Sequence, residues 1–139
     1  MTTIIGRFSP QIFALFRIVV GVLFSFHGLQ KIFGWPPMQH GGGGGSLPPL
    51  LIVSGWIELV GGLLIAIGLF AGWAAFICSG EMAVAYFTVH VAKGGPIPIV
   101  NQGELAAVYS WVFLYIAAHG AGMWSIDSMM RRRVPVVTT

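Results

Sequence analysis

The chain carries four carboxylates, and three of them lie within or at the edge of long hydrophobic stretches. These three are Glu58, Glu81 and Glu104, while Asp127 follows the last stretch. A carboxylate at membrane depth costs several kcal/mol unless it is paired or neutral, so each one marks a functional site by default. The chemistry open to such a group is proton exchange or hydrogen bonding to the polar head of a ligand.

Basic and aromatic side chains accompany these acids. Arg17 and Lys31 fall on one helical face of the first stretch, with His27 one turn before Lys31. Trp111 and Tyr115 are one turn apart in the last stretch. His27 could donate to a carbonyl oxygen, and the two aromatic side chains could wall a flat ring, although fillers and interface anchors are the alternative for both. Together these residues predict a polar pocket between helices.

The elements that must position these residues are membrane helices. Of 139 residues, 56% are hydrophobic and 8% are charged, which lies outside the usual range of soluble proteins. Each of four apolar stretches approaches the ~20 residues that a helix needs to cross ~30 Å of hydrocarbon. They cover residues 10–33, 50–70, 72–91 and 104–123. No stretch alternates as a barrel strand does, so we predict one all-α domain over 1–139, an integral membrane four-helix bundle.

The basic residues predict the orientation of this bundle. Arg7 precedes the first helix and three arginines at 131–133 follow the last, whereas Lys31 and Lys93 lie near the opposite ends. The positive-inside rule then places both termini in the cytoplasm. We expect a multi-pass protein of a bacterial cytoplasmic (inner) membrane. The basic tail at 124–139 is expected to meet anionic lipid headgroups. This asymmetry explains the basic pI, so no nucleic acid partner is expected.

Depth within the bilayer sorts the charged residues into two predicted layers. At ~1.5 Å per residue, Arg17 and Glu81 each lie ~10 to 14 Å from the cytoplasmic side. Glu58 lies ~12 Å below the outer side, with Lys31 just above it and His27 within reach. We therefore expect an inner pair, Arg17–Glu81, and an outer pair, Glu58–Lys31. Pairs that serve assembly alone are the alternative, although single polar contacts between membrane helices average under ~1 kcal/mol.

Two exoplasmic loops are predicted at the outer side. The first, 34–49, has prolines at both ends and five consecutive glycines at 41–45, so it is expected to be flexible, as a spacer or as a lid. The second leads into the last helix, where Asn101 is a predicted N-cap with Glu104 at the third helical position. Capping alone would explain both residues, and ligand binding is the alternative.

Neither a metal nor a haem is expected. Cys78 is the single cysteine, so the chain has no dithiol couple of its own, and no histidine or cysteine ligands cluster at a recognisable spacing. His27 and His119 lie at opposite predicted depths, and His40 and His90 lie at or beyond the outer boundary. A haem held by two histidines is therefore not expected either.

Several short motifs along the chain carry a family resemblance. They are Arg17, Gly28-Leu-Gln-Lys31, Glu58-Leu-Val-Gly61-Gly62, Glu81-Met82 with Ala85, Asn101-Gln-Gly103-Glu104 and Gly120-Ala-Gly122-Met-Trp-Ser125-Ile-Asp127. In order and spacing they resemble the DoxX family of small membrane proteins. The resemblance implies four membrane helices with both termini inside. It also implies a link to quinone-linked oxidoreductases, including thiosulfate:quinone oxidoreductase, or to thiol- and superoxide-handling enzymes.

The leading functional hypothesis is a membrane subunit of a quinone-linked oxidoreductase or of a redox and thiol-stress system. In it, Glu58, Glu81 and His27 exchange the protons that accompany quinone reduction. The predicted substrate-binding residues are Arg17, Lys31, Trp111, Tyr115, Asn101 and Glu104. Quinone is the expected ligand, and electrons come from a partner subunit or a soluble donor. The alternatives are an assembly or anchoring subunit, which docks on other subunits or on its own copies, and a protein that handles small solutes or lipids.

Overall fold

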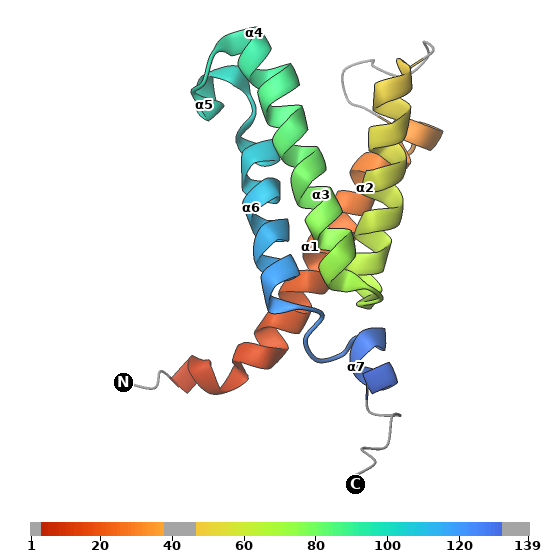
Figure 1. Ribbon diagram of the computed structural model, residues 1–139, viewed down its shortest axis with the longest axis vertical. Helices are drawn as coiled ribbons and strands as arrows, with labels where there is room; N and C mark the ends of the chain where they lie inside the picture. The colour runs from red at the N-terminus through yellow and green to blue at the C-terminus, as the bar shows by residue number, and fades with distance from the viewer. Residues whose placement is uncertain (1–3, 38–46, 132–139) are drawn as a thin grey trace, which may run out of the picture.

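The structure is a computed structural model that describes residues 4–37 and 47–131, and all of its regular elements there are helices. In chain order they are η1 (Ile4–Phe8), α1 (Ser9–Phe33), α2 (Pro49–Ile67), α3 (Ala71–Ala85), η2 (Tyr86–Val91), α4 (Ala92–Gly94), α5 (Pro98–Asn101), α6 (Glu104–His119) and α7 (Ile126–Arg131) (Figure 1). The predicted all-α class is confirmed for these residues. The glycine run at 41–45, His40, Arg132 and Arg133 lie outside the described residues.

Three continuous helical segments are long and apolar enough to cross a membrane. They cover Ile4–Phe33, Pro49–Ile67 and Ala71–Gly94. The helix α6 is apolar as well, but at 16 residues it is shorter than these three. Hydropathy therefore locates the long helices correctly, because length and composition alone decide whether a helix suits the hydrocarbon layer.

The helix ends differ from the prediction where glycines intervene. The second predicted helix, 50–70, stops before Gly68, and the last one, 104–123, stops before Gly120. Both glycines have positive φ, 71° and 83°, a backbone conformation that ends an α-helix and that glycine adopts without steric cost. The third predicted helix, 72–91, instead continues beyond its predicted end, because η2 and α4 follow α3 without a break.

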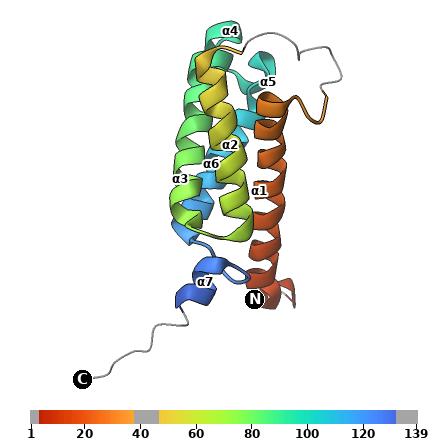
Figure 2. The same cartoon turned by 90° about the vertical axis from the view of Figure 1, so that its right-hand side faces the viewer.

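The helices α1, α2, α3 and α6 run roughly along one axis (Figure 2). Helix α1 packs along α2, and α3 packs against both α2 and α6. From the turn that joins them, α2 and α3 diverge toward the far end of the molecule, where α4 and α5 lie (Figure 1). The first and last elements, η1 and α7, both lie at the end where α2 turns into α3.

Glycines bring the backbones of α1 and α2 into contact. A Cβ atom at Gly21 would lie 2.6 Å from the carbonyl oxygen of Gly62, and one at Gly62 would lie 2.6 Å from that of Gly21. Real Cβ atoms do not approach a backbone this closely, so any side chain at these positions would force the helices apart. These glycines thus set α1 close enough to α2 for side chains to meet across the interface.

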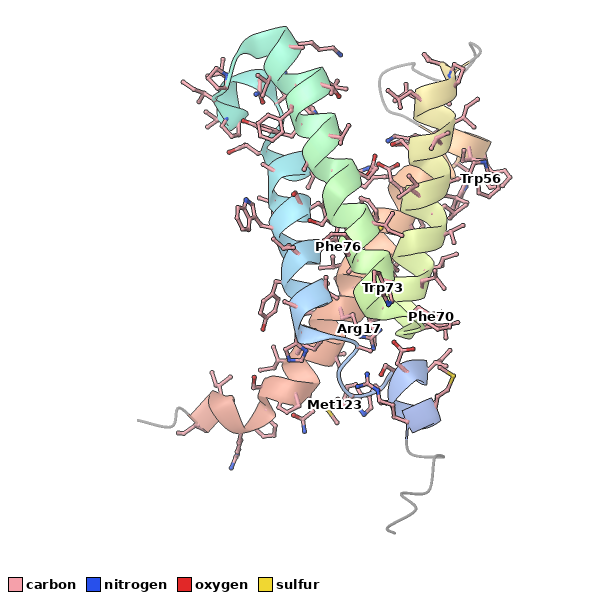
Figure 3. All side chains as sticks on the ribbon, viewed as in Figure 1. Arg17, Trp56, Phe70, Trp73, Phe76 and Met123 are labelled. Carbon is pink, nitrogen blue, oxygen red and sulfur yellow. The ribbon has the colours of Figure 1, made fainter. Side chains whose placement is uncertain are left out.

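The core of the helix set is small, and much of its surface is apolar. Phe24, Ile65 and Phe113 are fully buried between the helices. In contrast, Trp56 and Trp73 are 47% and 75% exposed, and their side chains project outward (Figure 3). Helices that are apolar on their outer as well as their inner face suit a lipid environment.

Candidate functional site

A buried ion pair joins α1 to α2. The Nζ atom of Lys31 lies 2.8 Å from Oε1 of Glu58, and the two side chains are 25% and 4% exposed. The pair lies beside Gly28, where a Cβ atom would be only 2.8 Å from the Cα atom of Leu59. The predicted outer pair is therefore confirmed, and the close approach of the two helices explains how a lysine on one reaches a carboxylate on the other.

A second carboxylate joins this pair through a serine. Lys31 Nζ also donates to Oγ of Ser54 over 3.0 Å, and Ser54 Oγ donates to Oε1 of Glu81 over 2.7 Å. One lysine and one hydroxyl thus connect two acids from α2 and α3. We call Lys31, Ser54, Glu58 and Glu81 the carboxylate cluster.

The predicted pairing of Glu81 with Arg17 is wrong. Glu58 stands ten positions before Gly68 and Glu81 stands ten positions after Ala71, the two residues that flank the α2–α3 turn. In an antiparallel hairpin, equal distances from the turn give equal depth. Counting from estimated span ends placed Glu58 and Glu81 in different layers, whereas counting from the turn places them together.

Arg17 lies instead beside the α2–α3 turn and is fully buried (Figure 3). Its Nη1 donates to the carbonyl oxygens of Ile65 and Ala66, the latter over 2.7 Å, and its Nη2 donates to that of Trp124 over 2.8 Å. A guanidinium that binds the last carbonyls of a helix satisfies groups with no partner inside that helix. Arg17 thus ties the end of α2 to the segment before α7, away from the carboxylate cluster.

The carboxylate cluster keeps two unused acceptors. Oε2 of Glu58 and Oε2 of Glu81 are buried and have no hydrogen-bond partner among the described residues. A buried polar atom without a partner is costly, and such atoms in native proteins are normally satisfied by water, a proton or a ligand. Each of these two oxygens can therefore hold a proton.

A cavity of about 260 Å³ opens beside the cluster, between α1, α2, the end of α3, η2 and the start of α6. Its polar lining residues are His27, Lys31, Ser54, Glu58, His90, Gln102 and Tyr109. The remaining walls are mainly apolar and include Phe24 and Met82. Glu81 does not line this cavity and reaches it through Ser54. The cavity therefore combines apolar walls with a few converging polar groups, as small-molecule sites do.

Two of the lining residues have polar atoms without a hydrogen-bond partner among the described residues. The rings of His27 and Tyr109 meet edge to face, with their centroids 6.1 Å apart. Neither the imidazole nitrogens of His27 nor the hydroxyl of Tyr109 forms a hydrogen bond within the described part of the chain. Both side chains can donate a hydrogen bond and accept one, so both can bind a ligand oxygen.

The aromatic walls predicted on α6 are wrong. Trp111 and Tyr115 are 74% and 55% exposed and face away from the cavity. The inward face of α6 instead carries Tyr109, Phe113 and Ile116, which follow one another at spacings of four and three. This spacing was visible in the sequence, but aromatic residues occur on both faces of α6, so the pattern did not show which face points inward.

The predicted capping role of Asn101 and Glu104 is also wrong. The N-cap residue of α6 is Gly103, and Glu104 is the exposed first residue of the helix. Asn101 ends α5, where its Oδ1 accepts from the amide of Gly103 and its Nδ2 donates to the carbonyl of Gly95, both over 2.7 Å. Asn101 thereby holds the loop from which Gln102 reaches the cavity.

His90 is a cavity residue that the sequence did not reveal. It lies on η2, where the chain is wound as a π-helix, a form often found at functional sites. Its Nδ1 lies 3.1 Å from the carbonyl oxygen of Asn101. The wider winding of η2 changes which side chains face inward, and no residue pattern in the sequence announces it.

Comparison with known proteins gives the family. The family model described as DoxX matches residues 12–91, more than half of the chain. The chain belongs to the DoxX family. All four residues of the carboxylate cluster lie in the matched segment. Together with the three long apolar helices, this membership makes the chain a membrane protein.

One curated relative comes from Haemophilus influenzae and bears the name "Uncharacterized protein". It is 46% identical over 124 residues, which cover 88% of this chain and 92% of the relative. No solved structure matches the chain. Any assignment of function therefore rests on the site itself.

Proposed function

We propose that this DoxX protein crosses a bacterial cytoplasmic membrane with four helical segments, formed by α1, α2, α3 with η2, and α6. The end that carries η1 and α7 faces the cytoplasm. Arg7 and Arg131 belong to these two elements, whereas Lys93 belongs to α4 at the opposite end. Such a bias of basic residues supports this orientation. The cavity beside the carboxylate cluster then lies in the outer half of the bilayer.

Within this membrane, we propose that the cavity binds the head group of a quinone and that the chain serves as the membrane subunit of a quinone-linked redox system. A quinone head is a flat ring with two carbonyl oxygens, so it requires apolar walls and hydrogen-bond donors. The observation that carries the proposal is the set of unpartnered groups at the cavity, His27, Tyr109 and the Oε2 atom of Glu58. In this proposal His27 and Tyr109 donate to the quinone carbonyls.

Quinone chemistry also requires groups that exchange protons, and in this proposal the carboxylates supply them. Reduction of a quinone to a quinol takes up two electrons and two protons. In this proposal Glu58 and His27 exchange protons with the bound ring, and Glu81 communicates with the cavity wall through Ser54. Electrons come from a partner subunit or from a soluble donor.

An apolar layer lies between the carboxylate cluster and Arg17, which favours a closed binding site over a passage for solutes. Phe24, which also lines the cavity, lies between Arg17 and His27 along α1. Ile65 lies between Glu58 and the turn along α2, and Cys78 lies between Glu81 and the turn along α3. All three are almost fully buried in one apolar cluster. In the described part of the chain, apolar packing therefore separates the carboxylate cluster from Arg17.

Equilibrium binding of a short-chain quinone to the purified protein in lipid nanodiscs tests the proposal. Decylubiquinone and menadione are suitable probes. Glu58→Gln and Tyr109→Phe each remove a group that faces the cavity, so each should weaken binding by about tenfold, the equivalent of one lost hydrogen bond. Glu104→Gln is the matched control, because this carboxylate is exposed and does not line the cavity.

Two results would contradict the proposal. One is the absence of saturable binding to the wild-type protein, which would favour an assembly or anchoring role. The other is an equal loss in Glu58→Gln and Glu104→Gln, which would show that the cavity does not hold the ring. Conversely, co-purification with a larger complex that is indifferent to Glu58→Gln would support the assembly role.

A further inference from the structure

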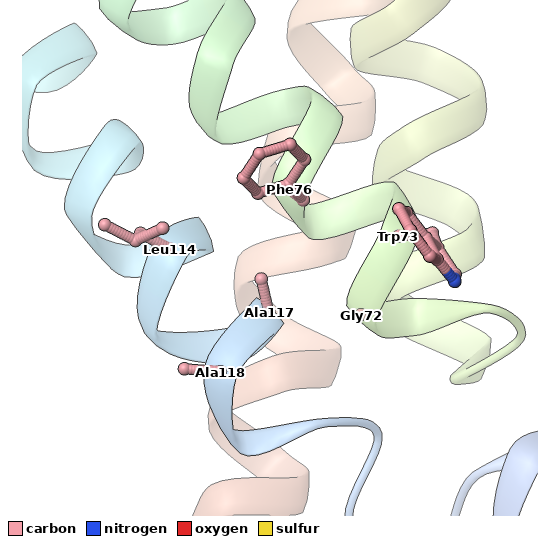
Figure 4. Close-up of a pocket in the computed structure, with 6 residues that line it drawn as sticks. All are labelled: Gly72, Trp73, Phe76, Leu114, Ala117 and Ala118. Carbon is pink, nitrogen blue, oxygen red and sulfur yellow. The ribbon is translucent and has the colours of Figure 1, made fainter.

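A second concave surface lies on the lipid-facing side of α3 and α6, near the α2–α3 turn. It is a groove of about 450 Å³ lined by Gly72, Trp73, Phe76, Leu114, Ala117 and Ala118 (Figure 4). The groove is hollow at its centre because the residues there are glycine and alanine, whose side chains are absent or small. Larger side chains rise at its edges: Trp73 and Phe76, on α3, are 75% and 58% exposed. Glycine and apolar side chains line the groove, and none of these residues lines the cavity beside the carboxylate cluster.

The groove continues toward α7 and becomes charged there. A second hollow of about 360 Å³ shares Gly72 and Trp73 with it and is also lined by Asp127 and Arg131. The two carboxylate oxygens of Asp127 accept from the amides of Phe70 and Ala71 over 2.9 and 3.1 Å, so both oxygens are engaged by backbone at the start of α3. Arg131 is exposed and forms no ion pair with any described residue.

We propose that this surface binds an anionic phospholipid of the leaflet on the side of the α2–α3 turn. One acyl chain lies in the groove between α3 and α6, and the phosphate binds the guanidinium of Arg131. Arginine forms charge-assisted hydrogen bonds with phosphate, and Trp73 suits the level where acyl chain and headgroup meet. Arg132 and Arg133, which follow in the sequence, lie outside the described residues and add two positive charges to this part of the sequence.

The order of apolar and charged parts favours a lipid over a second copy of the chain. From Phe76 to Arg131 the surface changes from apolar to charged in the direction from the membrane interior to its boundary, which is the order of acyl chain and headgroup in a lipid molecule. A helix from another copy would have to place an anionic group opposite Arg131. Among the described carboxylates, Glu58 and Glu81 are engaged inside, Glu104 lies at the opposite end of α6, and both oxygens of Asp127 accept from backbone amides.

Native mass spectrometry in detergent, with phosphatidylglycerol and phosphatidylcholine of identical acyl chains, tests this proposal. The wild-type protein should bind one phosphatidylglycerol roughly tenfold more tightly than phosphatidylcholine. Arg131→Gln should remove this preference while leaving weak binding of both lipids. Ala118→Trp, at an exposed position, should fill the groove and reduce binding of both. Lys93→Gln, at the opposite end of the molecule, is the matched control and should change nothing.

Equal binding of the two lipids by the wild-type protein, or an unchanged preference in Arg131→Gln, would overturn the proposal. A change of oligomeric state in Ala118→Trp, with no effect on lipid binding, would assign the groove to a second copy. Quinone binding is expected to remain unchanged in both variants, so this test and that of the quinone cavity can fail separately.

Discussion

A single methyl group at Gly28 should disturb both the fold and the site. A Cβ atom there would lie 2.8 Å from the Cα atom of Leu59 and would also meet the carbonyl oxygen of Gly55. Ordinary carbon contacts are about 3.5 to 4.0 Å, so Gly28→Ala should push α1 and α2 apart by about 1 Å. Overpacking of this kind typically costs about 1 to 3 kcal/mol.

The same displacement should reach the carboxylate cluster. Lys31 is one turn beyond Gly28 on α1, and Glu58 is the neighbour of Leu59 on α2. The 2.8 Å pair between them spans the interface that the methyl group widens. We therefore expect Gly28→Ala to lower the free energy of unfolding by about 2 kcal/mol and to weaken quinone binding as well.

Gly80→Ala is the matched control for this prediction. Gly80 is an exposed residue of α3, and a Cβ atom there would have no neighbour within 4 Å. This substitution should leave stability unchanged or raise it by up to ~1 kcal/mol through helix propensity. Unfolding by sodium dodecyl sulfate in mixed micelles, followed by circular dichroism, measures both variants. If Gly28→Ala were as stable as the wild type, or Gly80→Ala equally damaged, the inferred backbone contact would be refuted.

Three further predictions concern buried polar groups. Lys31→Met should lower the free energy of unfolding by about 1 to 3 kcal/mol, below the value for a fully buried pair because Lys31 is 25% exposed. The double variant with Lys31→Met and Glu58→Gln should recover part of this loss in the same assay. If the losses of the two single variants simply added, the two residues would not be interacting. Arg17→Gln should lower the free energy of unfolding by about 2 to 3 kcal/mol, since glutamine cannot donate to three carbonyl oxygens at once. The backbone amides just before α7 should also exchange their hydrogens faster. Unchanged exchange there would contradict the inferred link between α2 and this segment. Cys78 is 1% exposed, so it should react with a maleimide only after unfolding, and labelling of the folded protein would show that the apolar layer is open.

The long helices and one ion pair could be predicted because simple physical rules govern them. The length and apolarity of a segment decide whether it suits a bilayer, which located α1, α2 and α3. Lys31 and Glu58 were paired correctly because their estimated depths are similar and the glycines of their helices permit close contact. Rules of this kind need only the order of residues along each helix.

The remaining site residues depend on relations between helices that the sequence leaves open. The depth of Glu81 was misjudged because an error of about one turn in a helix end equals the difference in depth that was being judged. Trp111 and Tyr115 were placed inward because an apolar helix in lipid carries aromatic residues on both faces. His90 enters the cavity through the π-helical winding of η2, which depends on tertiary packing.

Photolabelling with an azidoquinone tests the central claim most directly. The protein in lipid nanodiscs is illuminated with the probe, and the labelled peptides are identified by mass spectrometry. We predict labels on η2 and on the first turns of α6, near His90 and Tyr109, which excess decylubiquinone prevents and Glu58→Gln diminishes. Labels confined to the α3–α6 groove around Trp73, or labels that excess quinone does not prevent, would contradict the assignment of the cavity as a quinone site.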